Sequence, residues 1–236
     1  LYVLFGGRSI IRVSYRHLTI AWSVIKRLFD VSLGGMGQFA IASSSWIFLM
    51  RIMSEFGEQA VAGYTISIRM LIFTILPAWG MANAAATLVG QNLGAAQGDR
   101  AERSVWRSAF YTMLFLLFVS IIYIIWAPSL VRFFHDAPLV VKYGTASLRI
   151  ICLGYVFFAY GMVISQAFNG AGDTRTPTLI NFICFWLLQI PLAYAMGLQF
   201  GLGPNGVFWA VAISESVLAV ICIVLFRKGK WKTVAI

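Results

Sequence analysis

The sequence predicts an all-α integral membrane protein, built as a six-transmembrane-helix bundle. Of its 236 residues, 60% are hydrophobic and 11% are charged, and the mean hydropathy is +0.84. Soluble domains are about 45–50% apolar and about 25% charged. The chain also holds several charge-free runs that reach the roughly 20 residues needed to cross a bilayer. These features exclude water-soluble enzymes, disordered tails and secreted disulfide scaffolds.

The charge-free runs define the helices in order. Four runs are separate, at 31–50, 70–98, 108–131 and 150–172. A fifth run, 176–214, is too long for one span, and the Gly- and Pro-rich segment 197–206 divides it. The last span carries one charge, Glu215. We expect spans at about 31–53, 61–88, 105–127, 145–168, 178–198 and 207–226, between a linker at 1–30 and a basic tail at 227–236.

Two helix starts carry typical capping signals. Asp99 and Glu102 have the spacing of a capping box, which predicts that they cap the third span. Thr176 followed by Pro177 has the pattern of an N-cap and a first-turn proline, and predicts the start of the fifth span.

The basic residues predict the orientation of the bundle. The net charge is +10, but the charges are too scattered for a nucleic-acid groove, and Lys and Arg are retained on the cytoplasmic side of membrane proteins. Thirteen of the 18 fall at the termini and in the loops around Arg100 and Arg175, which we therefore place in the cytoplasm. Arg8, Arg12 and Arg16 recur every four residues, as in an amphipathic segment on the membrane surface.

Two ionisable residues at membrane depth are candidates for function. Glu215 lies near the middle of the sixth span and is either a protonatable group in an ion pathway or a structural carboxylate bonded to a neighbouring helix. Arg69 shares a face of the second span with Thr65 and Asn83. It either lines a cavity or braces the outer loop, where Glu55 and Glu58 are available.

Amides and small residues supply the remaining polar groups of the spans. Gln38 precedes three serines in the first span, and Asn181 and Gln189 are eight residues apart on one face of the fifth. Cavity lining and bonding between helices are both open for these residues.

Enzymatic chemistry has no support in the sequence. Cys152, Cys184 and Cys222 lie in apolar runs without metal-ligand spacing, and His17 and His135 form neither a metal set nor a catalytic dyad. No nucleophile–base pair or phosphate-binding loop is present in the sequence. We expect neither a catalytic residue nor a bound metal or cofactor.

Three segments together resemble the multidrug and toxin extrusion (MATE) family. The first two, 58–69 and 84–95, cover the second span and the loop after it. The third, 168–177, reads Phe-Asn-Gly-Ala-Gly-Asp-Thr-Arg-Thr-Pro and is similar to the second cytoplasmic signature of that family. The resemblance runs from about residue 25 to 232.

The resemblance implies a twelve-helix transporter with two pseudo-symmetric lobes, of which this chain is the C-terminal six-helix half. Since the chain begins at Leu1 without a visible signal peptide, we expect it to be part of a longer gene product whose N-terminal lobe is its partner. The implied function is multidrug efflux across the inner membrane, in which organic and often cationic amphipathic compounds are exchanged for H⁺ or Na⁺. Several family members carry acids in the first and fourth of these spans, where this sequence has none at 31–54 and 148–172.

On this basis Glu215 is the candidate for ion coupling, and polar and aromatic residues of four spans are the candidates for substrate binding. A lipid or lipid-linked oligosaccharide flippase of related fold is the alternative function, followed by a channel or structural membrane subunit. The candidate substrate-binding residues are Gln38, Phe39, Thr65, Arg69, Asn83, Tyr160, Asn181 and Gln189.

Overall fold

The computed structural model describes residues 21–233, and every regular element in that range is helical. Five helices are long and apolar enough to cross a membrane, and a bent pair meets the same criteria together, which gives six when the pair is counted as one span. The prediction of an all-α bundle of six spans is thus confirmed. The elements are α2 (Trp22–Ser54), α3 (Glu58–Gly94), α4 (Gly98–Arg132), α5 (Pro138–Leu153), α6 (Tyr155–Gly170), α7 (Arg175–Asn181), η2 (Phe182–Gln189), α8 (Ile190–Tyr194), η3 (Ala195–Gln199), α9 (Pro204–Arg227) and η4 (Lys230–Thr233).

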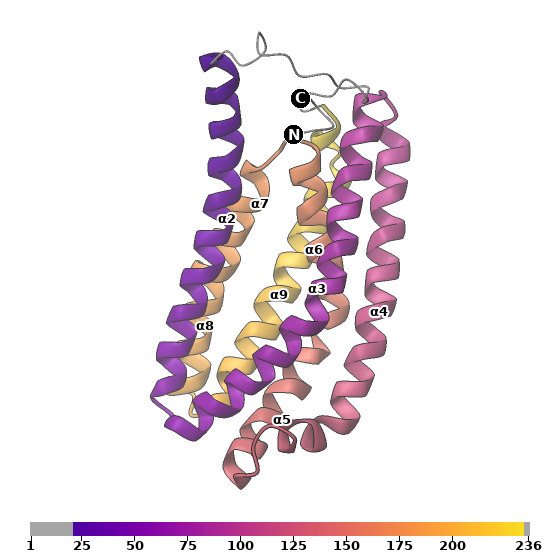
Figure 1. Ribbon diagram of the computed structural model, residues 1–236. Coiled ribbons are helices and arrows are strands. Elements are labelled where there is room, and N and C mark those ends of the chain that lie inside the picture. Colours follow the sequence, from indigo (N-terminus) through magenta and orange to yellow (C-terminus); the bar gives the residue numbers. More distant parts are fainter. Residues whose placement is uncertain (1–20, 234–236) are drawn as a thin grey trace, which may run out of the picture.

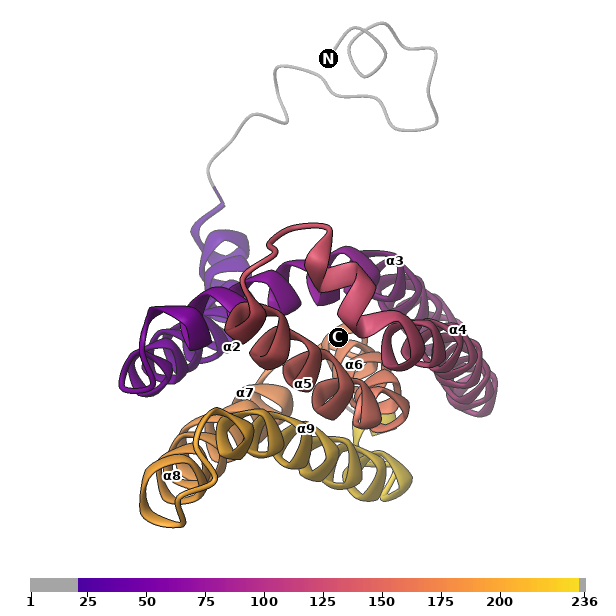
Figure 2. The same cartoon turned by 90° about the horizontal axis from the view of Figure 1, so that it is seen from below.

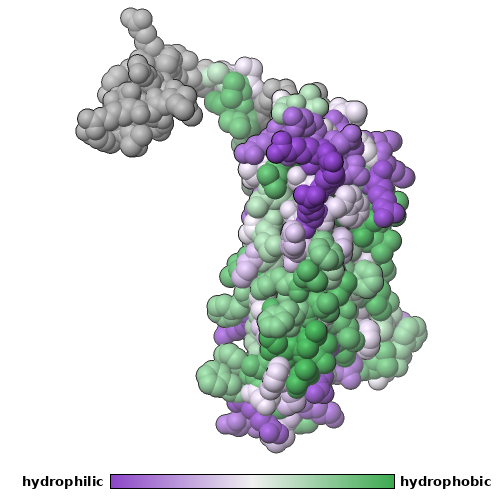
Figure 3. Space-filling view, turned by 90° about the vertical axis from the view of Figure 1, so that its right-hand side faces the viewer, coloured by the Kyte–Doolittle hydropathy of each residue, from purple (hydrophilic) through white to green (hydrophobic). Residues whose placement is uncertain are grey.

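The spans form one bundle in which α9 packs against α5 and α6 as well as against α8 and η2. In Figure 1, α2 lies beside α7 and α8, while α3, α4, α6 and α9 form the rest of the bundle. Figure 2, seen from below, shows α5 between the α3–α4 side and the α8–α9 side. On the face drawn in Figure 3, apolar side chains form a belt between two hydrophilic ends, as expected for a protein surrounded by lipid.

The first helix begins earlier than the apolar pattern predicts. It starts at Trp22 rather than near residue 31, because 22–30 contains neither Gly nor Pro and the helix continues beyond the apolar run. Part of the predicted linker is therefore helical. Arg8, Arg12 and Arg16 lie outside the described residues.

The fourth span is broken at Gly154. The helices α5 and α6 meet there at an angle of 58°, where the sequence predicts one continuous span. A β-carbon on Gly154 would lie 3.4 Å from the carbonyl oxygen of Ala212 on α9. This is an ordinary van der Waals distance, so the bend packs directly against the backbone of α9.

The fifth span is wound partly as π-helix, in η2 and η3. Between them, Pro191 lies in the first turn of α8. Proline has no N–H to donate to the preceding turn, so the regular α pattern cannot run unbroken through this span. Gln189 is the last residue of η2 and is buried.

Both predicted capping patterns are wrong in detail. Gln97 occupies the N-cap position of α4 without a side-chain capping bond, because Asp99 and Glu102 bind Lys232 instead. The α7 helix begins at Arg175, and Thr176 donates to Asp173 from its backbone nitrogen, at 3.1 Å, and from its hydroxyl, at 2.6 Å. The carboxylate three residues earlier therefore performs the capping that the sequence pattern assigned to Thr176.

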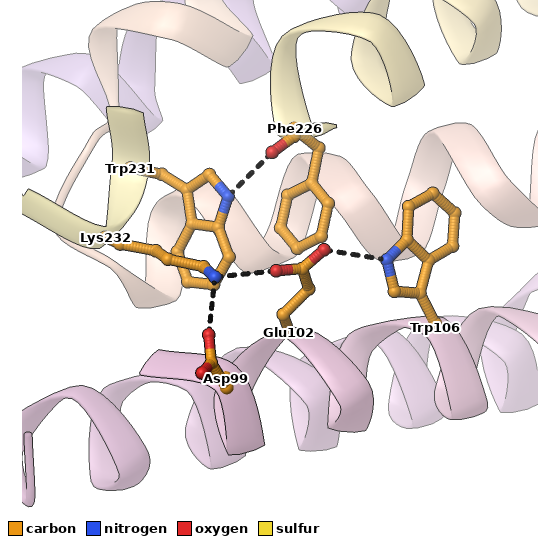
Figure 4. A network of polar contacts seen from close by, with 6 residues as sticks. All are labelled: Asp99, Glu102, Trp106, Phe226, Trp231 and Lys232. Carbon is orange, nitrogen blue, oxygen red and sulfur yellow. Dashed lines mark hydrogen bonds and ion pairs between the residues drawn. The ribbon is translucent and has the colours of Figure 1, made fainter. Parts of the chain in front are cut away.

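The side chain of Lys232 ties the end of the chain to the start of α4 (Figure 4). Its ammonium nitrogen lies 3.0 Å from Asp99 Oδ1 and 2.7 Å from Glu102 Oε2. The neighbouring Trp231 is buried, stacks on Phe226 with ring centroids 4.6 Å apart and donates to the Phe226 carbonyl oxygen at 2.9 Å. This arrangement holds η4 against the bundle.

The Lys232→Met variant is expected to lose stability in a pH-dependent way. Hydrogen bonds to Glu102 and then Asp99 raise the pKa of Lys232. The network therefore stabilises the fold fully below the pKa of an unfolded lysine, about 10.4, and its contribution is lost as the pH rises through the higher folded-state pKa. The melting temperatures of the wild type and the variant should differ at neutral pH and converge above about pH 10.4. A gap that stays constant into that alkaline range would contradict this account.

Candidate functional site

A cavity of about 320 Å³ lies inside the bundle, between α2, α3, the α5–α6 bend, η2 and α9. Its walls are mostly apolar and rich in aromatic rings. The aromatic lining residues are Trp46, Tyr64, Tyr155, Phe158 and Phe185, and the polar side chains at its wall include Gln189 and Glu215. A mainly apolar pocket with few convergent polar groups is the usual form of a small-molecule site.

Glu215 supplies the only carboxylate among the residues lining this cavity. Its neighbours Ser214 and Ser216 do not bond to it, because they donate to carbonyl oxygens of their own helix at 3.0 Å and 2.7 Å. Among the side chains that the structure describes, the Glu215 carboxylate has neither an ion pair nor a hydrogen bond. A carboxylate in such a place is costly when charged and unpaired. It can therefore take up a proton or attract a cation that enters the cavity.

Gln189 lies in the part of the wall formed by η2 and links two helices. It is 5% exposed, and its Oε1 accepts a hydrogen bond of 3.0 Å from the Ser45 hydroxyl on α2. The same hydroxyl also lies 3.3 Å from the Phe185 carbonyl oxygen. The Gln189 amide nitrogen makes no hydrogen bond to the described residues, so it can donate to a ligand.

Gln38 lies elsewhere and holds α2 against the α6–α7 loop. Its side chain exchanges two hydrogen bonds with Asn169, of 3.0 Å and 3.2 Å, and also donates to the Thr174 carbonyl oxygen at 3.3 Å. Asn169 in turn donates to Gln166 at 3.1 Å. Of the two roles left open by the sequence, bonding between helices is the one observed for Gln38.

The other predicted residues are spread over the lobe. Thr65 and Arg69 line a different cavity, beside the α4–α5 loop. Phe39 is 71% exposed, Asn83 is also exposed, and Tyr160 and Asn181 are half-buried without lining the cavity of Glu215. Of the nine predicted site residues, Gln189 and Glu215 line the first cavity and Thr65 and Arg69 line the second, while the other five line neither.

Sequence reasoning missed the aromatic wall. Tyr64, 1% exposed, stacks on Phe208 with ring centroids 5.7 Å apart, and the Tyr155 hydroxyl lies 3.4 Å from that of Thr74. Aromatic residues are abundant throughout this chain and also face lipid, so only Tyr64, inside the recognisable 58–69 segment, carried a local signal.

Comparison with known proteins identifies the family to which this fold and cavity belong. The MatE family model matches residues 36–195, more than half of the chain. The chain belongs to the MATE family. The expected relationship is therefore confirmed, and the lobe described above is that of a family of transporters.

Several relatives resemble this MATE chain along almost its whole length. It is 27% identical over 216 residues to a probable multidrug resistance protein NorM of Thermotoga maritima, covering 91% of this chain and 46% of that protein. It is 24% identical over 225 residues to the multidrug resistance protein MdtK of Photorhabdus laumondii, covering 94% and 49%. The chain thus spans about half the length of these curated relatives.

The solved structures agree in fold. A MOP superfamily transporter from Pyrococcus furiosus superposes with a TM-score of 0.90 at 21% identity, covering 99% of this chain and 53% of that chain. At this level of identity the likeness establishes the MATE lobe fold alone. The ligand has to be inferred from the chemistry of the site.

Proposed function

We propose that this chain is the C-terminal lobe of a secondary active multidrug efflux antiporter. It exports organic, often cationic, compounds in exchange for H⁺ or Na⁺, together with an N-terminal six-helix lobe of the same polypeptide. Two relatives, of which this chain covers about half the length, are named as multidrug resistance proteins, and these names support the proposal. The pairing of two lobes around a central site is the usual basis of alternating access in such transporters.

The proposal places the lobe in the inner membrane with the start of α2 and the end of α9 in the cytoplasm. Most basic residues outside the spans gather at that end of the bundle, where α3 and α6 also end (Figure 1). An excess of Lys and Arg is typical of the cytoplasmic side. Among the described residues, those of the cytoplasmic end are Lys26, Arg100, Arg103, Arg107, Arg175, Arg227, Lys228, Lys230 and Lys232.

The cavity of Glu215 is the observation that carries the proposal. In this chain the first and fourth spans lack acids, but both contribute to the cavity wall, with Trp46 from α2 and Tyr155 from α6. The Glu215 carboxylate on α9 thus lines the same cavity as these two spans. Neither Lys nor Arg lines the cavity within the described residues, which favours a cationic ligand over an anionic lipid headgroup.

Filling the cavity tests whether substrate export depends on it. The Ala42→Phe variant adds a ring at the cavity wall, and we expect ethidium efflux by the complete protein in cells to fall about tenfold because cavity space for the ligand is lost. Ala40→Phe is the matched control, since Ala40 is exposed on the same helix and does not line the cavity. Equal efflux by both variants at equal protein levels would contradict the proposal.

A further inference from the structure

Arg69 remains without a counter-charge at the end of the bundle opposite Lys232. It lies about three turns after the start of α3, is exposed, and has no ion-pair partner among the side chains that the structure describes. Glu55, one of its expected partners, instead lies 3.9 Å from Arg51. A cation on an apolar span is costly unless an anion or water reaches it.

The second cavity, of about 530 Å³, places other donors around this cation. It lies between α3 and the α4–α5 loop, and Thr65, Arg69 and His135 are among its lining residues. Thr65 precedes Arg69 by four residues and shares its helix face. The Ala137 backbone nitrogen donates to Nδ1 of His135 at 3.1 Å, so the neutral ring carries its proton on Nε2 and can donate from there.

The same cavity has apolar walls that reach the outer surface of the helices. Phe73 and Phe134, which are 75% and 59% exposed, line it together with Met70. Neither Asp nor Glu contributes to its lining within the described residues. The cavity therefore combines hydrogen-bond donors and one fixed positive charge with exposed rings that suit acyl chains.

We propose that this cavity binds the phosphate group of a membrane phospholipid. The Arg69 guanidinium pairs with two phosphate oxygens, a geometry for which its planar fork is suited. Thr65 and His135 donate to the remaining oxygens, and Phe73 and Phe134 contact the acyl chains. The site is separate from the cavity of Glu215 and does not depend on the efflux proposal, because lipid binding is measured without transport.

Binding of phosphatidylglycerol to the complete protein in detergent, measured by native mass spectrometry, tests the site. We expect Arg69→Gln to weaken binding about tenfold or more, and Lys142→Gln, which removes an exposed charge outside the cavity, to leave it unchanged. Diacylglycerol, which has the same acyl chains without the phosphate group, should bind weakly to both variants. If the Arg69→Gln variant does not accumulate in cells, Arg69→Lys and Thr65→Val are used in its place, and each should weaken binding several-fold.

Two further outcomes of this experiment would identify a different anion as the partner of Arg69. Unchanged phosphatidylglycerol binding by Arg69→Gln, or by both Arg69→Lys and Thr65→Val, overturns the proposal. The partner of Arg69 would then be an acid outside this lobe. Inorganic phosphate alone is titrated into the delipidated protein. If it binds in an Arg69-dependent way while phosphatidylglycerol does not, the ligand is free phosphate and the lipid assignment is wrong.

Discussion

Efflux by the Glu215→Gln protein is expected to lose its dependence on the H⁺ or Na⁺ gradient. The substitution keeps the shape of the side chain and removes the carboxylate that we propose binds and releases the coupling ion. A coupling free energy between two sites is commonly about 1–3 kcal/mol, so we expect gradient-driven ethidium efflux to fall by about one to two orders of magnitude. Efflux is measured in vesicles at fixed substrate while the pH or Na⁺ gradient is varied.

A matched control separates coupling from general damage. Glu58→Gln removes an exposed carboxylate in the first turn of α3 that does not line the cavity, and should leave the gradient dependence intact. The melting temperatures of both variants should be close to that of the wild type, because Glu215 has no partner in the described residues to lose. Unaltered gradient dependence in Glu215→Gln would assign the carboxylate a structural role.

The Gly170→Ala protein is expected to be strongly destabilised. A β-carbon on Gly170 would lie 2.7 Å from Cα and 2.8 Å from the carbonyl carbon of Ala86. These are backbone atoms, so the contact is relieved only if α3 and α6 separate. Overpacking of this kind costs about 1–3 kcal/mol or more. The measurement is the thermal unfolding of the purified complete protein, together with its yield from membranes.

Gly80→Ala is the control for this prediction. Gly80 lies inside α3, and a β-carbon there meets nothing within 4 Å. The substitution should be neutral or stabilising by up to about 1 kcal/mol, because alanine favours helix over glycine. Equal stability of the Gly80 and Gly170 variants would show that the α3–α6 contact tolerates separation.

The Gly170–Ala86 contact also explains two of the segments by which the family is recognised. Ala86 lies in 84–95 and Gly170 in 168–177, and the Gly170 carbonyl oxygen is also 3.3 Å from a β-carbon placed on Gly90. Small residues allow helix backbones in a membrane to approach closely. The two segments therefore meet as a packing contact between α3 and α6.

The spans were predictable because lipid leaves the backbone little choice. A segment in hydrocarbon must satisfy its own N–H and C=O groups, so an apolar run of sufficient length becomes a helix. Irregularities depend on neighbours instead. The break at Gly154 packs against the backbone of α9, and the fifth span is π-helical up to Gln189, just before Pro191. No pattern of hydropathy records either feature.

The candidate site was predictable only where its residue type is rare in a membrane span. Glu215 stood out because a carboxylate is rare at membrane depth, and Gln189 was one of several polar residues on a helix face. Gln38 and Gln189 are both amides on inward faces, but one is bonded to Asn169 and the other lines a cavity. Which neighbour an amide meets depends on residues more than 100 positions away.

The sequence by itself determined the membrane class, the six spans and the family, because composition, run length and short packing motifs are local properties. Only the tertiary structure decided which polar residues share a cavity, that Asp99 and Glu102 bind Lys232 rather than capping a helix, and that Arg69 lies apart from Glu215. These outcomes depend on how helices distant in sequence rotate and cross. That rotation is set by the summed packing of many small residues.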